Sequence, residues 1–237
     1  MPANAIELAK QQSPGLFPPA NGSSGLWTYI GNSGVPSGGG VGRVNSVRVQ
    51  PGSTSTYYAC APAGGLWKTT NSGTSWTCMN TDFLASIGVT DIAIDPNNTN
   101  ILYIATGDGD ASDTYALGVL KSTDGGLTWS ATGLTATPNN NFLIRRLIIN
   151  PTNPNLLIAA ASDGIWQTID GGTNWIQRQT GYFMDLEFKP SDPSIVYAST
   201  FDRDGNAEIF RSTNSGQSWT SVALLSDVIR INLAVSP

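Results

Sequence analysis

Charged side chains recur at one position of a repeated segment, and they are the first candidates for chemistry. The position lies five residues before a proline and holds Ser46, Asp91, Arg146, Asp185 and Asn232. The alternating signs of Asp91, Arg146 and Asp185 leave two interpretations open. These residues either form ion pairs between neighbouring repeats or line a polar ligand site.

Further acidic and aromatic residues gather in two long segments, 106–118 and 200–207, and after the run that ends at Ala161. The ligand-binding candidates there are Asp108, Asp110, Asp113, Tyr115, Asp163, Phe201 and Asp202. Alternating carboxylates can bind Ca²⁺ through oxygen, so Asp108, Asp110 and Asp113 form a weak calcium candidate that lacks the distal bidentate glutamate. Solvated turn residues and polar ligand contacts remain alternatives. We expect no other metal and no cofactor.

Composition excludes several classes of site. The chain has no histidine, so it cannot supply a histidine-based catalytic triad or a histidine metal ligand. Its 17 acidic and 12 basic residues give a net charge of −5, which argues against nucleic-acid binding. No apolar run reaches the ~18 residues of a membrane span. Residues 1–20 lack the charged start and apolar stretch of a signal peptide.

An eight-residue segment occurs four times and organises the chain. These octets cover 69–76, 122–129, 168–175 and 212–219, and their terminal tryptophans are 53, 46 and 44 residues apart. A short apolar run that ends in X-Pro precedes each octet, and a second strand-like run lies between them. Apolar alternation and β-branched residues favour strands, so each unit contains four short strands.

Four antiparallel strands repeated every 44–53 residues are typical of propeller blades. We therefore predict an all-β fold, a β-propeller with blades at about 40–84, 85–137, 138–181 and 182–226. A fifth blade begins near 227, so the chain is expected to be a fragment of a larger propeller. Residues 1–25 form a leader segment, with one short helical turn within 3–12. Residues 26–31 are a possible outer strand that closes the ring.

The octets resemble the Asp-box (BNR) signature, Ser/Thr-x-Asp-x-Gly-x-Thr-Trp. This resemblance implies hairpin turns in which the acid or amide accepts backbone N–H bonds, glycine adopts positive φ, and tryptophan covers the sheet. The corresponding residues are Asn71, Gly73, Trp76, Asp124, Gly126, Trp129, Asp170, Gly172, Trp175, Asn214, Gly216 and Trp219. We expect a structural role for all of them, and none is assigned to catalysis.

Asp-box propellers include sialidases and xyloglucanases. The segments 38–47 and 61–68 look most like large sialidase-like propeller proteins of Bacteroidetes, which usually leave the cell by type IX secretion. No sialidase arginine triad is recognisable, because Arg145 and Arg146 are adjacent on one strand and should point to opposite faces. Xyloglucanases place a catalytic aspartate before the first Gly-Gly, where this chain reads Ala61-Pro-Ala-Gly-Gly65.

These features favour a non-catalytic binding module, secreted by a bacterium or displayed on its surface, within a large surface protein or adhesin. The expected partners are a glycan or a surface protein, together with further blades of the same polypeptide. One alternative is a glycoside hydrolase of the sialidase-like or xyloglucanase-like class, and another is a purely structural module. Cys60 and Cys78 should remain unpaired, because strands two places apart lie ~9.6 Å from each other and a disulfide tolerates only ~7 Å.

Overall fold

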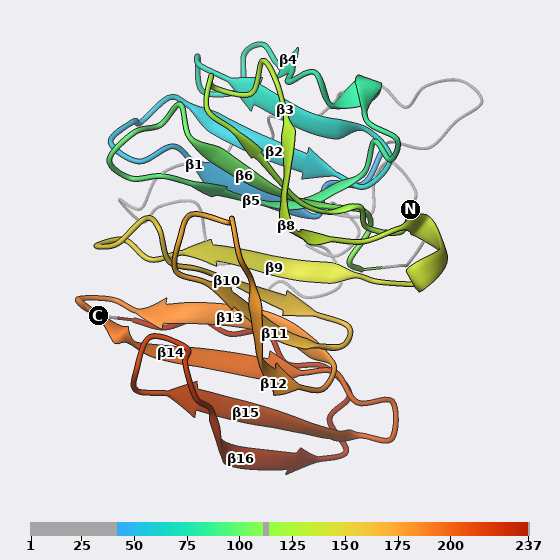
Figure 1. Cartoon of the computed structure of the whole chain (residues 1–237), viewed down its shortest axis with the longest axis vertical. Coiled ribbons are helices and arrows are strands. Elements are labelled where there is room, and N and C mark those ends of the chain that lie inside the picture. Colours follow the sequence, from blue (N-terminus) through green and yellow to red (C-terminus); the bar gives the residue numbers. More distant parts are fainter. Residues whose placement is uncertain (1–41, 111–113, 237) are drawn as a thin grey trace, which may run out of the picture. The chain divides into compact units, whose positions relative to one another are not determined.

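The computed structural model describes residues 42–110 and 114–236, which form sixteen strands (Figure 1). The leader at 1–25, its helical turn, the closing strand at 26–31 and Asp113 lie outside the described residues. Helical structure among the described residues is limited to two 3₁₀ turns, η1 (Thr81–Phe83) and η2 (Pro138–Asn140). The predicted all-β fold is confirmed.

The strands form four antiparallel sheets, and each sheet is one blade. Blade 1 contains β1 (Ser46–Val49), β2 (Tyr57–Ala61), β3 (Gly65–Thr69) and β4 (Thr77–Cys78). Blade 2 contains β5 (Val89–Ile94), β6 (Leu102–Thr106), β7 (Gly118–Ser122) and β8 (Ser130–Thr135). Blade 3 contains β9 (Ile144–Ile149), β10 (Leu157–Ala161), β11 (Gly164–Thr168) and β12 (Ile176–Thr180). Blade 4 contains β13 (Phe183–Lys189), β14 (Asp192–Thr200), β15 (Asn206–Ser212) and β16 (Thr220–Ser226).

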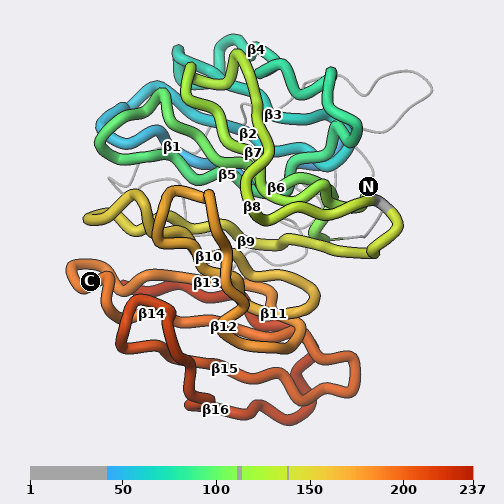
Figure 2. The backbone as a smooth tube through the Cα atoms, in the orientation of Figure 1, coloured from blue at the N-terminus to red at the C-terminus, as the bar shows by residue number. Residues whose placement is uncertain are grey.

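Successive blades pack face to face, and Figure 2 shows them following one another in chain order. Every residue of β6 and of β10 is buried, because a blade covers each face of these sheets. Three apolar clusters fill the three junctions. Leu66 and Ile104 lie in the first cluster, Tyr103 and Leu157 in the second, and Ile158 and Phe183 in the third. Apolar burial between sheets therefore holds the blades together.

The octets form the turns between the third and fourth strands of the blades. In blade 2, Oδ1 of Asp124 accepts the N–H groups of Leu127 at 3.1 Å and of Thr128 at 2.9 Å. The Ser122 hydroxyl donates to the same Oδ1 at 2.7 Å. Gly126 has φ of 93°, a conformation that glycine adopts without steric cost. The turn therefore depends on a hydroxyl residue, an acid or amide, and a glycine at these spacings, as the other octets also show.

The octets also connect one blade to the next. In blade 3, Gln167 Nε2 donates to the backbone oxygen of Ser215 in the octet of blade 4, at 2.7 Å. Lys121 occupies the corresponding position in blade 2, and its Nζ donates to the Gly171 oxygen in the octet of blade 3, at 3.1 Å. Each of these turns thus exposes a backbone carbonyl oxygen, and a side chain of the preceding blade donates a hydrogen bond to it.

Both cysteines are free, as the strand order predicts. Cys60 lies on β2 and is fully buried, whereas Cys78 lies on β4 and is half-buried. Strand β3 runs between β2 and β4. Burial raises the pKa of the Cys60 thiol far above its ordinary value, which keeps the thiol protonated and unreactive.

Candidate functional site

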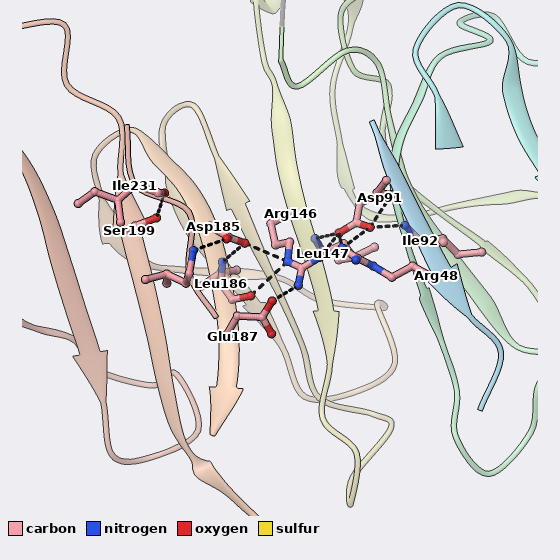
Figure 3. Close-up of polar contacts among 12 residues, drawn as sticks. Arg48, Asp91, Ile92, Arg146, Leu147, Asp185, Leu186, Glu187, Ser199 and Ile231 are labelled. Atoms are coloured by element: carbon pink, nitrogen blue, oxygen red, sulfur yellow. Dashed lines mark hydrogen bonds and ion pairs between the residues drawn. The ribbon is translucent and has the colours of Figure 1, made fainter. Parts of the chain in front are cut away.

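The first strands of the blades carry the recurring charged position, and they bring its residues together. Strands β5, β9 and β13 pack against one another in that order. Figure 3 shows Arg146 of β9 between Asp91 of β5 on one side and Asp185 and Glu187 of β13 on the other. Of the two interpretations of this position, ion pairing between neighbouring blades is the one observed. A role of the same residues in ligand binding remains a proposal.

Asp91 is the most deeply buried of these carboxylates, with only 1% of its surface exposed. Nη2 of Arg48 lies 2.9 Å from its Oδ1, and Nη1 of Arg146 lies 3.4 Å from its Oδ2. The backbone N–H of Leu147 donates to Oδ2 at 3.1 Å. Burial raises the pKa of Asp91, and the Arg48 charge and the Leu147 N–H oppose that shift. Asp91 therefore joins three blades through one side chain.

Asp185 repeats part of this arrangement one junction further along the chain. Its Oδ1 lies 3.1 Å from Nε of Arg146, and its Oδ2 accepts the backbone N–H of Leu233 at 2.8 Å. The hydroxyl of Ser199 donates to the backbone oxygen of Ile231 at 2.7 Å. Residues 231–233 thus lie beside blade 4, as Leu147 lies beside blade 2.

Glu187 is, like Asp91, a carboxyl group of this site whose pKa is raised. It pairs with Nη2 of Arg146, and 31% of its side chain is exposed. Burial, followed by the negative charge of Asp185, raises the pKa of Glu187 to about 6. A carboxyl group with such a pKa can carry a proton near neutral pH, which is the requirement for a general acid.

A pocket lies at the ends of these first strands. β-Bulges determine which side chains face it. The pairing between β9 and β10 shifts by one residue at Arg145, and β5 and β13 shift at Thr90 and Met184. A bulge places two consecutive residues against one partner residue and redirects their side chains. Arg145 and Arg146 consequently line the same pocket. The expectation that they point to opposite faces was wrong, because it assumed an unbroken pleat.

The pocket has a volume of about 490 Å³ and is lined mainly by charged groups of the first strands. Arg43, Asp110 and Arg230 contribute to its rim. Asp110 lies 2.7 Å from Nη1 of Arg230 and 3.8 Å from Nη1 of Arg43. Arg43 also pairs with Asp108, which is fully buried. The rim thus pairs arginine with aspartate, as the floor of the pocket does.

Arg145 differs from the other arginines of the pocket. Its Nη2 donates to the Tyr182 hydroxyl at 2.6 Å, and its guanidinium lies 4.3 Å from the centre of the Tyr182 ring. The ring of Phe201 lies 5.3 Å beyond, centre to centre. Nε and Nη1 of Arg145 are buried and have no hydrogen-bond partner among residues 42–110 and 114–236. Burial lowers the pKa of Arg145, although an arginine of this kind keeps its charge.

The remaining sequence-predicted residues lie in separate places. Tyr115 is half-buried, and its backbone oxygen accepts a bond from Ser86 at 3.3 Å. Asp202 caps its own turn by accepting the N–H of Asp204 at 2.8 Å. Asp163 lies on an exposed turn between β10 and β11, where its Oδ1 accepts the indole N–H of Trp166 at 2.9 Å.

The calcium candidate is not assembled by the described residues. Asp108 and Asp110 are directed to arginines, which compete with a cation for the same oxygens. Within 42–110 and 114–236, no group of three acidic, cysteine or histidine side chains could hold a metal ion. Asp113 lies outside this part of the chain.

The octet acids lie in their turns and have pKa values that reflect those bonds. The hydroxyl and N–H of Thr128 lower the pKa of Asp124 to about 2. The N–H and amide of Asn174 lower the pKa of Asp170 to about 2. Asn71 and Asn214 accept N–H bonds at the same place in blades 1 and 4. None of the four side chains lines the charged pocket.

Sequence reasoning missed Arg48, Glu187 and Arg230 of the pocket, and it weighed Arg43 and Arg145 only as members of an arginine triad that it rejected. Two of them carried a usable signal. Arg48 and Glu187 each lie two residues after the recurring position, and residues two apart on a strand share a face. No comparable signal marks Arg43 or Arg230, which lie outside the strands.

Comparisons with known proteins agree with this fold. No known family model matches the chain. A xyloglucanase of Hypocrea jecorina is 28% identical over 227 residues, covering 79% of this chain and 27% of that protein. A xyloglucanase of a Paenibacillus species is 28% identical over 225 residues, covering 79% and 22%. The chain thus spans about a quarter of the length of these relatives.

Among solved structures, the GH74 xyloglucanase of Xanthomonas campestris superposes with a TM-score of 0.59 and 23% identity. The match covers 77% of this chain and 30% of that one. At this identity the likeness supports the β-propeller fold alone. The similarity in sequence is to xyloglucanases, and no sialidase is among these proteins, so the resemblance to sialidase-like proteins is unsupported at that level of detail.

Proposed function

We propose that the chain is part of a glycoside hydrolase of the xyloglucanase-like propeller class. The observation that carries this proposal is the similarity to xyloglucanases over 79% of the chain, along a fold that those enzymes share. Such hydrolysis needs two carboxyl groups, one of which holds a proton. Glu187, half-buried in a pocket of about 490 Å³ and with a pKa of about 6, is the described carboxyl group best suited to hold it.

The arrangement also favours a second function, glycan binding without hydrolysis. The pocket carboxylates Asp91, Asp110, Asp185 and Glu187 all pair with arginine. A carboxylate held in this way is a poor nucleophile or base. In addition, the stretch Ala61–Gly65 has no carboxylate where the resemblance to xyloglucanases requires one. A polar pocket lined by these arginine–carboxylate pairs would then bind a sugar chain without cleaving it.

One experiment separates the two functions. The chain is incubated with xyloglucan and with an unsubstituted β-glucan, while reducing ends and retention on the polysaccharide are both measured. Release of reducing ends that Glu187→Gln abolishes supports hydrolysis, with Asp192→Asn, a half-buried acid outside the pocket, as the matched control. Retention on the polysaccharide without release of reducing ends supports binding alone. If the chain is not retained and releases no reducing ends, both functions are refuted.

We also propose that a further blade of the same polypeptide covers the outer face of blade 1. Val47 and Val49 on β1 are 55% and 57% exposed. The corresponding Ile92 and Ile94 on β5 are 1% and 6% exposed, because blade 1 covers them. An apolar sheet face of this kind is normally packed against another layer.

An extracellular location, secreted or on the cell surface, is part of the same proposal. Polysaccharides of this class lie outside the cell, so a protein that acts on them must be exported. Within the described residues, no helix has the length and apolar character needed to cross a membrane. A surface protein remains the alternative to a glycan as the partner. Type IX secretion remains a prediction for the export route.

A further inference from the structure

A second pocket lies in the crevice between blades 2 and 3, separate from the charged pocket, and we propose that it binds one neutral pyranose unit of a glycan. This inference rests on the proposed carbohydrate function and adds a subsite to it. The crevice pocket has a volume of about 310 Å³. The residues used here are Leu134, Asn140, Phe142, Ser162, Asp163 and Trp166.

The lining of the crevice pocket combines apolar and hydrogen-bonding groups. Trp166 and Phe142 are half-buried and supply apolar surface, whereas Leu134 is 5% exposed and belongs to the core cluster against which both pack. Asp163 and Asn140 are exposed. A sugar ring presents an apolar face of C–H groups and a rim of hydroxyls, so it needs both kinds of partner at once. Small-molecule sites generally combine an apolar lining with a few placed polar groups.

The polar groups retain bonding capacity for a ligand. Oδ1 of Asp163 accepts the Trp166 indole N–H at 2.9 Å, whereas no hydrogen bond from a described residue reaches its Oδ2. Oδ1 of Asn140 accepts the Thr137 hydroxyl at 2.5 Å, and its amide N–H groups have no partner among the described residues. One acceptor and one donor are therefore available to sugar hydroxyls.

Comparison with blade 1 shows that a blade can hold this tryptophan without a carboxylate. Trp67 occupies the position of Trp166, and its indole N–H donates to the backbone oxygen of Gly64 at 2.7 Å. Gly64 occupies the position of Asp163, so a main-chain oxygen performs that task in blade 1. In blade 3 the main-chain oxygen of Asp163 accepts the Gln177 amide at 2.9 Å, so one carboxylate oxygen holds the indole and the other is left over. We assign this second oxygen to the ligand.

The charge of the pocket selects the class of sugar. Asp163 is its one charged side chain among the described residues. An unpaired carboxylate repels uronic acids and sulfated sugars, while it accepts bonds from neutral hydroxyls. The subsite should consequently prefer xyloglucan oligosaccharides to oligogalacturonides.

The test measures binding of a xyloglucan heptasaccharide to the full chain by titration calorimetry. Asp163→Ala and Asn140→Ala should each weaken binding about tenfold, the loss expected for one hydrogen bond to a charged or well-placed group. Asp163→Asn keeps an acceptor for Trp166 and controls for disturbance of the indole, and it should still weaken binding. Asp82→Ala, an exposed acid outside the pocket, should not.

Two results overturn the proposal in different ways. If the wild-type chain binds the heptasaccharide and the Asp163 and Asn140 variants bind it equally well, the subsite is refuted while the carbohydrate function stands. If the wild-type chain binds no xyloglucan oligosaccharide, the proposed function fails and the subsite fails with it. Stronger binding of an oligogalacturonide would refute the assignment to a neutral sugar.

Discussion

Replacing Asp91 by alanine should be among the most damaging single changes in the first strands. The side chain is 1% exposed and pairs with Arg48 at 2.9 Å and with Arg146 at 3.4 Å. It also accepts the backbone N–H of Leu147, a residue that is itself 1% exposed. Truncation removes all of these contacts at once and leaves their donors in place.

The magnitude follows from what the truncation leaves behind. Removing one partner of a buried ion pair costs about 3–5 kcal/mol, and an orphaned buried N–H accounts for about 1–3 kcal/mol of such a loss. Arg48 is 31% exposed and Arg146 15% exposed, so water recovers part of their solvation. We therefore expect about 3 kcal/mol for Asp91→Ala, which lowers the melting temperature by roughly 6–12 °C in a chain of this size.

Asp91→Asn should cost less than Asp91→Ala. Asparagine keeps the size of the side chain and one acceptor oxygen. Because burial raises the pKa of Asp91, the ionised form carries a desolvation cost that the amide avoids. Losing the charge for Arg48 and Arg146 then accounts for the remaining destabilisation.

The assay is urea denaturation followed by tryptophan fluorescence, with Asp82→Ala as the exposed control. The control should leave the free energy of unfolding unchanged within about 0.5 kcal/mol. A loss below about 1 kcal/mol for Asp91→Ala, with an unchanged dependence on urea, would show that the carboxylate does not join the blades. If Asp91→Asn and Asp91→Ala lowered the free energy of unfolding equally, the role assigned to the size and the acceptor oxygen of the side chain would be refuted.

Three further predictions concern single contacts. Gln167→Leu should destabilise the chain by about 1–3 kcal/mol in urea denaturation, because Gln167 is 1% exposed and the Ser215 oxygen loses its donor. The half-buried Gln179, which donates only to the oxygen of its neighbour Thr180, is the control, and Gln179→Leu should cost much less. The pKa of Asp124 is lowered to about 2, so its contribution to stability is present above pH 4 and lost as the pH falls towards 2. Asp124→Asn should remove that acid-dependent loss. An unchanged dependence of stability on pH in the variant would contradict the turn assignment. The pKa of Glu187 is raised to about 6, so the folded state binds its proton more tightly than the unfolded state and stability falls as the pH rises from 4.5 to 6. Glu187→Gln should then be more stable than wild type by about 1 kcal/mol above pH 6, after allowance for its partial exposure, and equal to it below pH 4.5.

The sequence by itself determined the repeat, and with it the fold. An octet with glycine and tryptophan at fixed positions requires a particular hairpin turn, because only glycine readily adopts the positive φ found at Gly126. X-Pro ends each first strand, and the apolar alternation defines the sheet faces. These signals are local, so four copies in phase sufficed to predict four-stranded blades and two unpaired cysteines.

Only the tertiary structure decided what the charged residues do. The sequence placed Asp91, Arg146 and Asp185 at one recurring position, but whether they pair depends on how closely neighbouring first strands pack. Because of the bulge at Arg145, the adjacent Arg145 and Arg146 line one pocket. A one-residue register shift of this kind cannot be recognised from the residue types. Arg43 and Arg230 reach the same rim from segments far apart in the chain. Contacts of this kind depend on blade packing, which is set by burial of whole sheet faces and not by any local pattern.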